Sequence, residues 1–140
     1  MGSNIEGRLG INDRSSKFSS CPCLIETQLP SRPVKVSCGW GHSAVVCKNG
    51  EVYSWGIGEY GALGTGSRNT EWAPTRMSIG QDVKARNVSC GNRHTAIIAR
   101  STPVTTSILM CGLGDAGQLG LGHFDTELQP KPVIFGEDIR

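Results

Sequence analysis

Apolar and polar side chains alternate in short runs along this chain, and stretches rich in glycine and polar residues separate the runs. Such alternation is typical of half-buried β-strands. No segment spaces its apolar residues as an amphipathic helix would. The pattern therefore predicts an all-β fold of short strands, at residues 34–36, 43–47, 51–55, 74–77, 85–90, 94–100 and 108–111.

Two turns connect pairs of these predicted strands. Asn49 and Gly50 stand between the runs at 43–47 and 51–55. Asn-Gly is a strong signal for a type I′ hairpin, in which both central residues have positive φ. The next pair is joined by a longer stretch, residues 101–107. Because insertions at hairpin tips are well tolerated, we expect a surface loop there.

Two sequence phrases recur at a nearly fixed interval. A glycine-rich phrase begins at Gly2 (GSNIEGRLG), Gly56 (GIGEYGALG) and Gly112 (GLGDAGQLG). A second phrase begins at Val36 (VSCGWGHSA) and again at Val88 (VSCGNRHTA), 52 residues later. A period of this size indicates a repeat architecture, in which one supersecondary unit is copied and stacked. Because the units contain short strands, we expect propeller blades of about four strands each.

The phrases divide the chain into a partial repeat at 1–35, a repeat at 36–87 and a partial repeat at 88–140. Residues 5–8 (IEGR) also match a common protease-cleavage linker, which would make the start an expression remnant. A linker, however, has no reason to supply the residues that the other copies share. We therefore interpret this segment as part of a repeat, because it keeps, without a gap, Gly2, Gly7, Leu9 and Gly10.

The order of the motifs distinguishes between families of propeller repeats. The chain lacks the Gly-Gly doublet expected of kelch repeats, and it lacks the Trp-Asp dipeptide of WD40 repeats, whose period is shorter. Its order is V-x-C-G-x-x-H-[S/T]-A, strand, turn, strand, then [W/C]-G-x-[G/N]-x-x-G-x-L-G. This order, over nearly the whole chain, closely resembles the regulator of chromosome condensation (RCC1) repeat. The resemblance implies a seven-bladed β-propeller, of which this chain supplies about two to three blades.

An incomplete ring of blades leaves sheet edges and apolar faces open to pairing. Seven blades of this repeat length need roughly 360 residues. We therefore expect the chain to be a fragment of a larger protein, or to be completed by another chain or by copies of itself.

Composition adds mainly exclusions. The formal net charge of +2 is too small to suggest a nucleic-acid-binding surface, so we do not expect a nucleic-acid partner. No apolar run approaches the roughly 18 residues that a membrane helix needs, and no signal-peptide core lies near the start. We therefore expect no membrane association and an intracellular location, cytoplasmic or nuclear.

His42 and His94 are the residues that most resemble catalytic bases or metal ligands. They occupy equivalent positions of two repeats, whereas a catalytic residue is needed only once. We interpret both as structural residues that bridge turn backbones by hydrogen bonds. His123 lies outside the phrases, and we expect it to be exposed and assign it no role.

The glycine-rich phrase could be mistaken for a nucleotide-binding loop. G-x-G-x-x-G follows a predicted strand at Gly56 and at Gly112, but a further turn, rather than a helix, comes next. No Lys-Ser or Lys-Thr pair follows the glycines, as a phosphate-binding loop requires. We interpret the glycines as turn residues, and we predict no cofactor and no catalytic residue.

The six cysteines do not have the spacing of a metal site. Cys21 and Cys23 form a C-x-C pair without a matching second pair. Cys38 and Cys90 stand at equivalent repeat positions, where a small buried side chain would fit. We therefore expect reduced thiols in the core and no bound metal.

Two tryptophans and three acidic residues complete the candidates. Trp40 stands at a variable position of the second phrase, where an exposed aromatic side chain would suit a protein contact, whereas we expect Trp55 to pack within a blade. Three acidic residues occupy nearly matching loop positions and could meet a basic partner, although a solvated loop is the simpler interpretation. They are Glu6, Glu59 and Asp115.

Repetition without a unique polar constellation favours a non-enzymatic protein–protein interaction module. The resemblance also implies an alternative, guanine-nucleotide exchange on a small GTPase, which needs no chemistry of its own. The expected partners are therefore proteins, with a small GTPase as the alternative. Chromatin binding is a third hypothesis, and the low charge gives it the least support.

Overall fold

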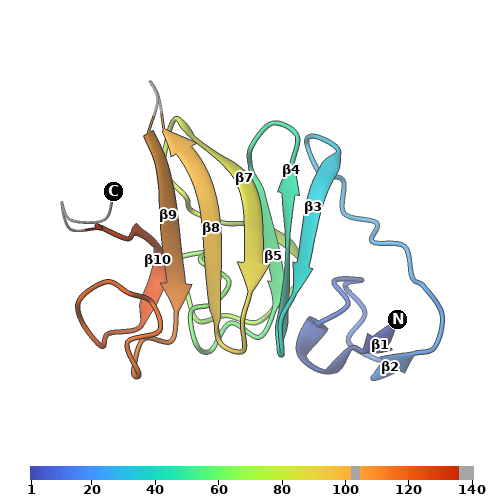
Figure 1. Ribbon diagram of the computed structural model, residues 1–140. Helices are drawn as coiled ribbons and strands as arrows, with labels where there is room; N and C mark the ends of the chain where they lie inside the picture. Colours follow the sequence, from blue (N-terminus) through green and yellow to red (C-terminus); the bar gives the residue numbers. More distant parts are fainter. Residues whose placement is uncertain (102–104, 136–140) are drawn as a thin grey trace.

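The computed structural model describes residues 1–101 and 105–135, and every regular element longer than three residues in this part is a β-strand. Two antiparallel four-stranded sheets follow a short ribbon of two strands (Figure 1). The first sheet contains, in chain order, β3 (Pro33–Cys38), β4 (His42–Cys47), β5 (Val52–Gly56) and β6 (Glu71–Arg76). The second contains β7 (Val83–Cys90), β8 (His94–Ser101), β9 (Thr105–Gly112) and β10 (Glu127–Pro132). The ribbon contains β1 (Gly2–Ser3) and β2 (Phe18–Ser19), with a 3-10 turn, η1 (Ile5–Gly7), between them.

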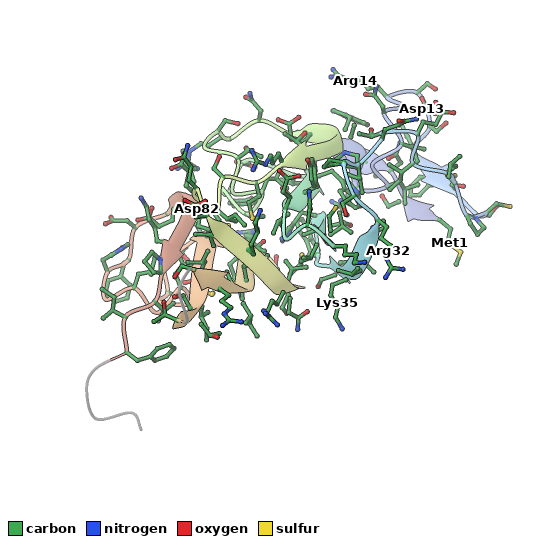
Figure 2. All side chains as sticks on the ribbon, turned by 90° about the horizontal axis from the view of Figure 1, so that it is seen from above. Met1, Asp13, Arg14, Arg32, Lys35 and Asp82 are labelled. Atoms are coloured by element: carbon green, nitrogen blue, oxygen red, sulfur yellow. The ribbon has the colours of Figure 1, made fainter. Side chains whose placement is uncertain are left out.

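The two sheets stand side by side as neighbouring propeller blades. Both β3 and β4 of the first sheet contact β7, the first strand of the second sheet. Figure 1 shows the two sheets next to each other. Seen from above, the ribbon near Met1 lies at one end of the molecule and the second blade lies at the other (Figure 2). The apolar core contains Ala44, Val46, Val52, Met77, Ala85, Val88, Ile97, Ala99, Leu109 and Cys111. Both blades contribute to this core, so each sheet buries its apolar face against the other.

The ribbon repeats the last two strands of a blade. In each copy, the first glycine of the glycine-rich phrase pairs across to the following strand. The pairs are Gly2–Ser19, Gly56–Glu71 and Gly112–Glu127. The predicted blade architecture of about four strands is confirmed for both complete sheets, and residues 1–19 follow the same plan.

Backbone angles support the interpretation of the first residues as a repeat. The glycine that ends the phrase has a left-handed φ in all three copies, with values of 69° at Gly10, 61° at Gly64 and 65° at Gly120. Two residues later, Gly66 and Gly122 are again left-handed, and the first copy places Asn12 there with φ 54°. Asparagine tolerates this conformation better than other non-glycine residues, so the turn survives the exchange.

The hairpin between β4 and β5 differs from the predicted type. Only Gly50 has a positive φ, at 86°, and its N–H donates to the oxygen of Cys47 at 2.8 Å. This is a turn followed by a left-handed glycine, a three-residue hairpin loop, and not type I′. The side chain of Asn49 accepts a hydrogen bond from the backbone N–H of Glu51 at 3.1 Å, which holds this turn instead.

The second hairpin is shorter than predicted. The sequence placed a loop over 101–107, but β8 and β9 pair as far as Ser101 and Thr105. Most of the expected loop is therefore strand, and the rest, residues 102–104, lies outside the described residues. Threonine is favoured in strands, and Thr105 and Thr106 fit an exposed strand end, which explains why the polar composition misled the prediction.

The predicted burial of the cysteines is wrong for part of the set. Cys47 and Cys111 are buried, but Cys21, Cys23 and Cys38 are exposed. Cys90 is half-buried because the backbone of the preceding blade lies over it, with its Sγ 3.5 Å from the oxygen of Ser37. Among the described residues, no helix is long and apolar enough to cross a membrane.

Candidate functional site

A hydrogen-bonded relay joins the two blades at the start of β4. His42 is buried, and its Nε2 lies 2.7 Å from Oγ1 of Thr95 in β8. Thr95 Oγ1 in turn donates its only proton to the backbone oxygen of Ala62, also 2.7 Å away. His42 must therefore be the donor in the first bond, which places its proton on Nε2.

Burial keeps this imidazole neutral. Desolvation lowers the pKa of His42 from 6.5 to about 4, and the neighbouring His94 also lowers it. The predicted hydrogen bonds from His42 to turn backbones are replaced by one to the side chain of Thr95, because the turn of His42 faces the next blade. The relay reaches the backbone only at its far end, at Ala62.

The bond from a hydroxyl to a backbone oxygen recurs between the first blade and the preceding repeat. Ser43 Oγ donates to the backbone oxygen of Arg8 at 3.4 Å, and the buried indole of Trp55 donates to the same oxygen at 3.1 Å. In the next repeat Sγ of Cys111 takes the place of the indole N–H, 3.7 Å from the oxygen of Ala62. Contacts that recur with the repeat serve the stacking of blades, so a functional site must be sought among residues that differ between copies.

Four such residues form a row on the loops at one end of the blades. The guanidinium carbon of Arg8 lies 4.9 Å from the ring centroid of Trp40. The guanidinium carbon of Arg93 lies 5.9 Å from the same ring and 4.2 Å from the ring of Tyr60. We call Arg8, Trp40, Arg93 and Tyr60 the arginine–aromatic row. Their distances are those of cation–π contacts.

The repeat does not require this row. In the second phrase, Asn92 stands where the first copy has Trp40, and Gly41 stands where the second copy has Arg93. Only the stacking of unequal copies brings one tryptophan between two arginines. The signal in the sequence was the variable turn position of Trp40, but the arginines gave no sign before the blades were placed next to each other.

The row is accessible from solvent. Trp40 is 54% exposed, as the sequence predicted, and Arg93 is exposed beside it. Arg8 is half-buried, with its Nη2 3.8 Å from a carboxylate oxygen of Glu6. Of the three acidic residues singled out in the sequence, all are exposed, and only Glu6 contacts the row.

Comparison with protein families agrees with these repeats. The family model described as the regulator of chromosome condensation (RCC1) repeat matches residues 1–46 and 49–98. The chain belongs to the RCC1 repeat family. A second model with the same description matches residues 34–62 of this RCC1-repeat chain.

Known proteins are similar over nearly the whole chain. The human probable E3 ubiquitin-protein ligase HERC3 is 35% identical over 132 residues, which are 94% of this chain and 12% of HERC3. The crystal structure of human WBSCR16 matches with a TM-score of 0.80 and 27% identity, covering 99% of this chain and 35% of that one. Prp20p of Saccharomyces cerevisiae matches with a TM-score of 0.77 and 18% identity, covering 92% and 32%. The chain thus corresponds to a partial RCC1 propeller, about a third of the solved ones.

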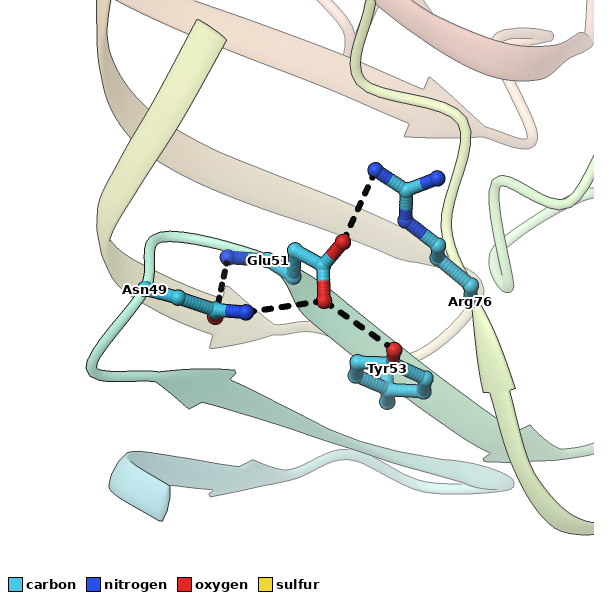
Figure 3. A network of polar contacts seen from close by, with 4 residues as sticks. All are labelled: Asn49, Glu51, Tyr53 and Arg76. Atoms are coloured by element: carbon cyan, nitrogen blue, oxygen red, sulfur yellow. Dashed lines mark hydrogen bonds and ion pairs between the residues drawn. The ribbon is translucent and has the colours of Figure 1, made fainter. Parts of the chain in front are cut away.

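A second set of polar residues that differ between the RCC1 repeats lies at the ends of the strands opposite to the arginine–aromatic row. Oε2 of Glu51 accepts hydrogen bonds from Asn49 at 3.0 Å and from Tyr53 at 3.2 Å, while Oε1 lies 3.0 Å from Nη2 of Arg76 (Figure 3). The bond from Asn49 is the main reason why the pKa of Glu51 lies below its usual range. The sequence analysis missed this network, because its members come from two strands and a turn.

This network borders a hollow of about 600 Å³ between the first blade and the segment that leads to β7. Its lining contains two acidic residues, Glu51 and Asp82, and two basic residues, Arg76 and Lys84, so the hollow has no net charge to attract a ligand. We therefore regard the network as a clamp that fixes the β4–β5 hairpin against β6. The exposed pair adds little to stability by itself.

The described residues leave part of each outer face of the RCC1 blades uncovered. Val88 of the second blade is 7% exposed because the first blade covers it, whereas its counterpart Val36 is 69% exposed. On the other side, Ile98 is 41% exposed, whereas its counterpart Val46 is fully buried. An apolar groove of about 840 Å³ runs along the uncovered face at β3, with Val36 and Trp55 in its lining.

The remaining candidate residues add no chemistry. His123, predicted to be exposed, is half-buried, with its nitrogens 3.4 Å from Asp125 and 3.6 Å from Glu127. Within residues 1–101 and 105–135, no three His, Cys, Asp or Glu side chains gather as they would around a metal ion.

Proposed function

We propose that this RCC1-repeat segment is a non-catalytic protein-binding module, and that its partner contacts the arginine–aromatic row. The observation that carries the proposal is an exposed Trp40 held between Arg8 and Arg93 on loops that the repeat leaves variable. Tryptophan, tyrosine and arginine are the residues most enriched among the energetic centres of protein interfaces. All three residue types occur together in the arginine–aromatic row, which is accessible from solvent.

The polar groups of the blade joint support a non-catalytic role. His42 is buried, neutral and bonded to Thr95, so it has no access to a substrate. The glycine-rich phrases lead into turns, and these turns hold the joint through the oxygens of Arg8 and Ala62. The names of relatives such as HERC3 refer to an enzyme, but this chain corresponds to only 12% of HERC3.

The proposal is tested with the chain purified from cells of its source together with the proteins bound to it. We expect Trp40→Ala to release bound proteins that wild type and Ile134→Ala retain, because Ile134 is an exposed apolar residue outside the row. Each released protein is then purified and its binding measured directly by calorimetry. An identical set of bound proteins for wild type, Trp40→Ala and Arg93→Gln would contradict a role of the row in binding.

Guanine-nucleotide exchange on a small GTPase is the second candidate. Its support is Prp20p, whose structure was solved together with a study of its binding to Gsp1p and histones, but 18% identity shows a shared fold alone. The test is release of labelled nucleotide from a panel of purified small GTPases. Accelerated release by this chain that depends on row residues would place exchange first, and no acceleration by a longer protein that contains it would remove exchange.

We further propose that another RCC1 blade covers each uncovered face, whether from a longer polypeptide, another chain or a second copy. The exposure of Val36 and Ile98, compared with the burial of their counterparts, supports this proposal. When the chain is expressed alone, we expect a mass in solution above 14.9 kDa, because the apolar faces associate. A stable monomer that does not bind an apolar dye would contradict it. The intracellular location, cytoplasmic or nuclear, stays a prediction.

A further inference from the structure

We propose that the arginine–aromatic row recognises an acidic peptide segment of its partner, in which two carboxylates reach the two arginines and the intervening chain lies on Trp40. This inference rests on the proposed function, since it names the chemistry of the partner. It follows from the way in which the two guanidinium groups are held and from the charges around them.

Arg93 is arranged to accept a carboxylate. Its guanidinium carbon lies 4.2 Å from the Tyr60 ring and 5.9 Å from the Trp40 ring, so aromatic faces fix the position of the group. Contact with a ring occupies the face of a guanidinium and leaves the N–H donors at its edge, which match the two oxygens of a carboxylate. No carboxylate of the described residues lies within ion-pair distance of Arg93. Its charge is therefore available to a partner.

Arg8 supplies the second cation. Its carbon lies 4.9 Å from the Trp40 ring, and its contact with Glu6, at 3.8 Å, is too long for a hydrogen bond. Its Nε is buried and has no hydrogen-bond partner among the described residues, so the guanidinium is not satisfied by the chain itself. The buried Nε lies out of reach of a partner, but the terminal N–H groups of the partly exposed side chain can donate to a bound acceptor.

The spacing of the two arginines suits an extended peptide. Both guanidinium carbons lie close to one indole ring, at 4.9 and 5.9 Å, which limits their separation to about 11 Å. Alternate residues of an extended chain point to the same side and are about 7 Å apart. Carboxylates at alternate positions, with the reach of their own side chains, can therefore meet both arginines. Trp40, which is half exposed, adds apolar surface beside the two arginines.

The charges around the row favour an acidic peptide over a nucleic acid. Binding to a phosphate backbone draws on many cations, whereas this row has two and the whole chain has a formal net charge of only +2. Exposed Glu6 and Glu59 on the adjoining loops leave the two arginines as isolated cations, which do not form the continuous positive surface that a line of phosphates needs. Two discrete carboxylates need only the two arginines.

The experiment measures fluorescence anisotropy of a labelled glycine–serine peptide that carries aspartate at alternate positions. The matched peptide has asparagine in place of each aspartate. We expect the aspartate peptide to bind the chain and the asparagine peptide to bind at least tenfold more weakly. Arg93→Gln and Arg8→Gln should each weaken the aspartate peptide tenfold or more, because a hydrogen bond between charged groups is lost in each. Trp40→Ala should also weaken it.

The matched control is Arg100→Gln, since Arg100 is an exposed arginine at the far end of β8. Equal binding of the two peptides, or an equal loss with Arg100→Gln, would overturn the acidic partner. Tighter binding of a single-stranded oligonucleotide, abolished by Trp40→Ala, would overturn it in favour of base stacking. If neither probe binds but Trp40→Ala still releases cellular proteins, the proposed function stands and the acidic partner is refuted. If the row variants change nothing in either assay, both fail.

Discussion

Two glycines at the same position of two repeats allow the contact between blades to be measured in isolation. Gly61 and Gly117 have the same backbone conformation, with φ of 75° and 74°. A Cβ added at Gly61 would lie 2.9 Å from the backbone oxygen of Glu127 and 2.9 Å from Cδ2 of Leu128, both in β10. A Cβ added at Gly117 would meet only Phe124, at an ordinary contact distance of 3.5 Å.

The alanine variants of these two glycines share one destabilising effect and differ in another. In both variants, alanine in a left-handed conformation costs about 1 kcal/mol, and the reduced entropy of the unfolded chain offsets part of this in both. Only Gly61→Ala must also move a backbone oxygen of the adjacent strand. Overpacking of this kind adds about 1–3 kcal/mol. We therefore expect Gly61→Ala to lower the free energy of unfolding by at least about 1 kcal/mol more than Gly117→Ala does.

Equilibrium unfolding in urea, followed by tryptophan fluorescence, to which the buried Trp55 contributes, measures this difference. With an m-value of about 2 kcal/mol/M, a difference of 1 kcal/mol separates the two midpoints by about 0.5 M. Equal midpoints for the two variants would refute the claim that the glycine-rich phrase of one repeat packs tightly on the next blade. A midpoint for Gly117→Ala below that of Gly61→Ala would refute it more strongly.

Two further predictions concern the relay between the blades. Thr95→Val leaves the N–H of His42 buried without a partner and leaves the oxygen of Ala62 with only the weak contact from Sγ of Cys111. We therefore expect unfolding in urea to show a loss of about 3 kcal/mol, against less than about 0.5 kcal/mol for Thr106→Val at an exposed position. Similar losses for both variants would contradict the relay. Because the pKa of His42 falls from 6.5 to about 4 on folding, the unfolded chain binds the proton more readily, and stability should decline as pH falls from about 6.5 to about 4, by up to roughly 3 kcal/mol, and no further on this account below that. Melting temperatures across this range should decline for wild type and stay nearly level for His42→Gln, and parallel curves would contradict the assignment.

The sequence predicted features that recur and missed those that depend on the contact between unequal copies. The phrases at Val36 and Val88 predicted the strands, the blades and the burial of Trp55, because repeat, pattern and turn chemistry agree there. They could not reveal that His42 bonds to Thr95, since the partner lies in the next blade and the pattern does not say which face meets it. The same limit applies to Cys38, which is exposed for lack of the cover that its counterpart Cys90 has from Ser37.

The difference between covered and uncovered copies means that Gly117 can report whether a further blade covers the second blade. A Cβ added at Gly7 or Gly61 would lie 2.9 Å from a backbone oxygen of the next repeat, that of Glu71 or Glu127, whereas a Cβ at Gly117 would meet only the side chain of Phe124, at 3.5 Å. If a further blade covers this face in a longer protein or in a complex, Gly117 must come as close to its backbone as Gly61 does to β10. Gly117→Ala should then become as destabilising there as Gly61→Ala, although it is mild in the chain alone. A mild effect in every assembly would show that no blade packs on this face.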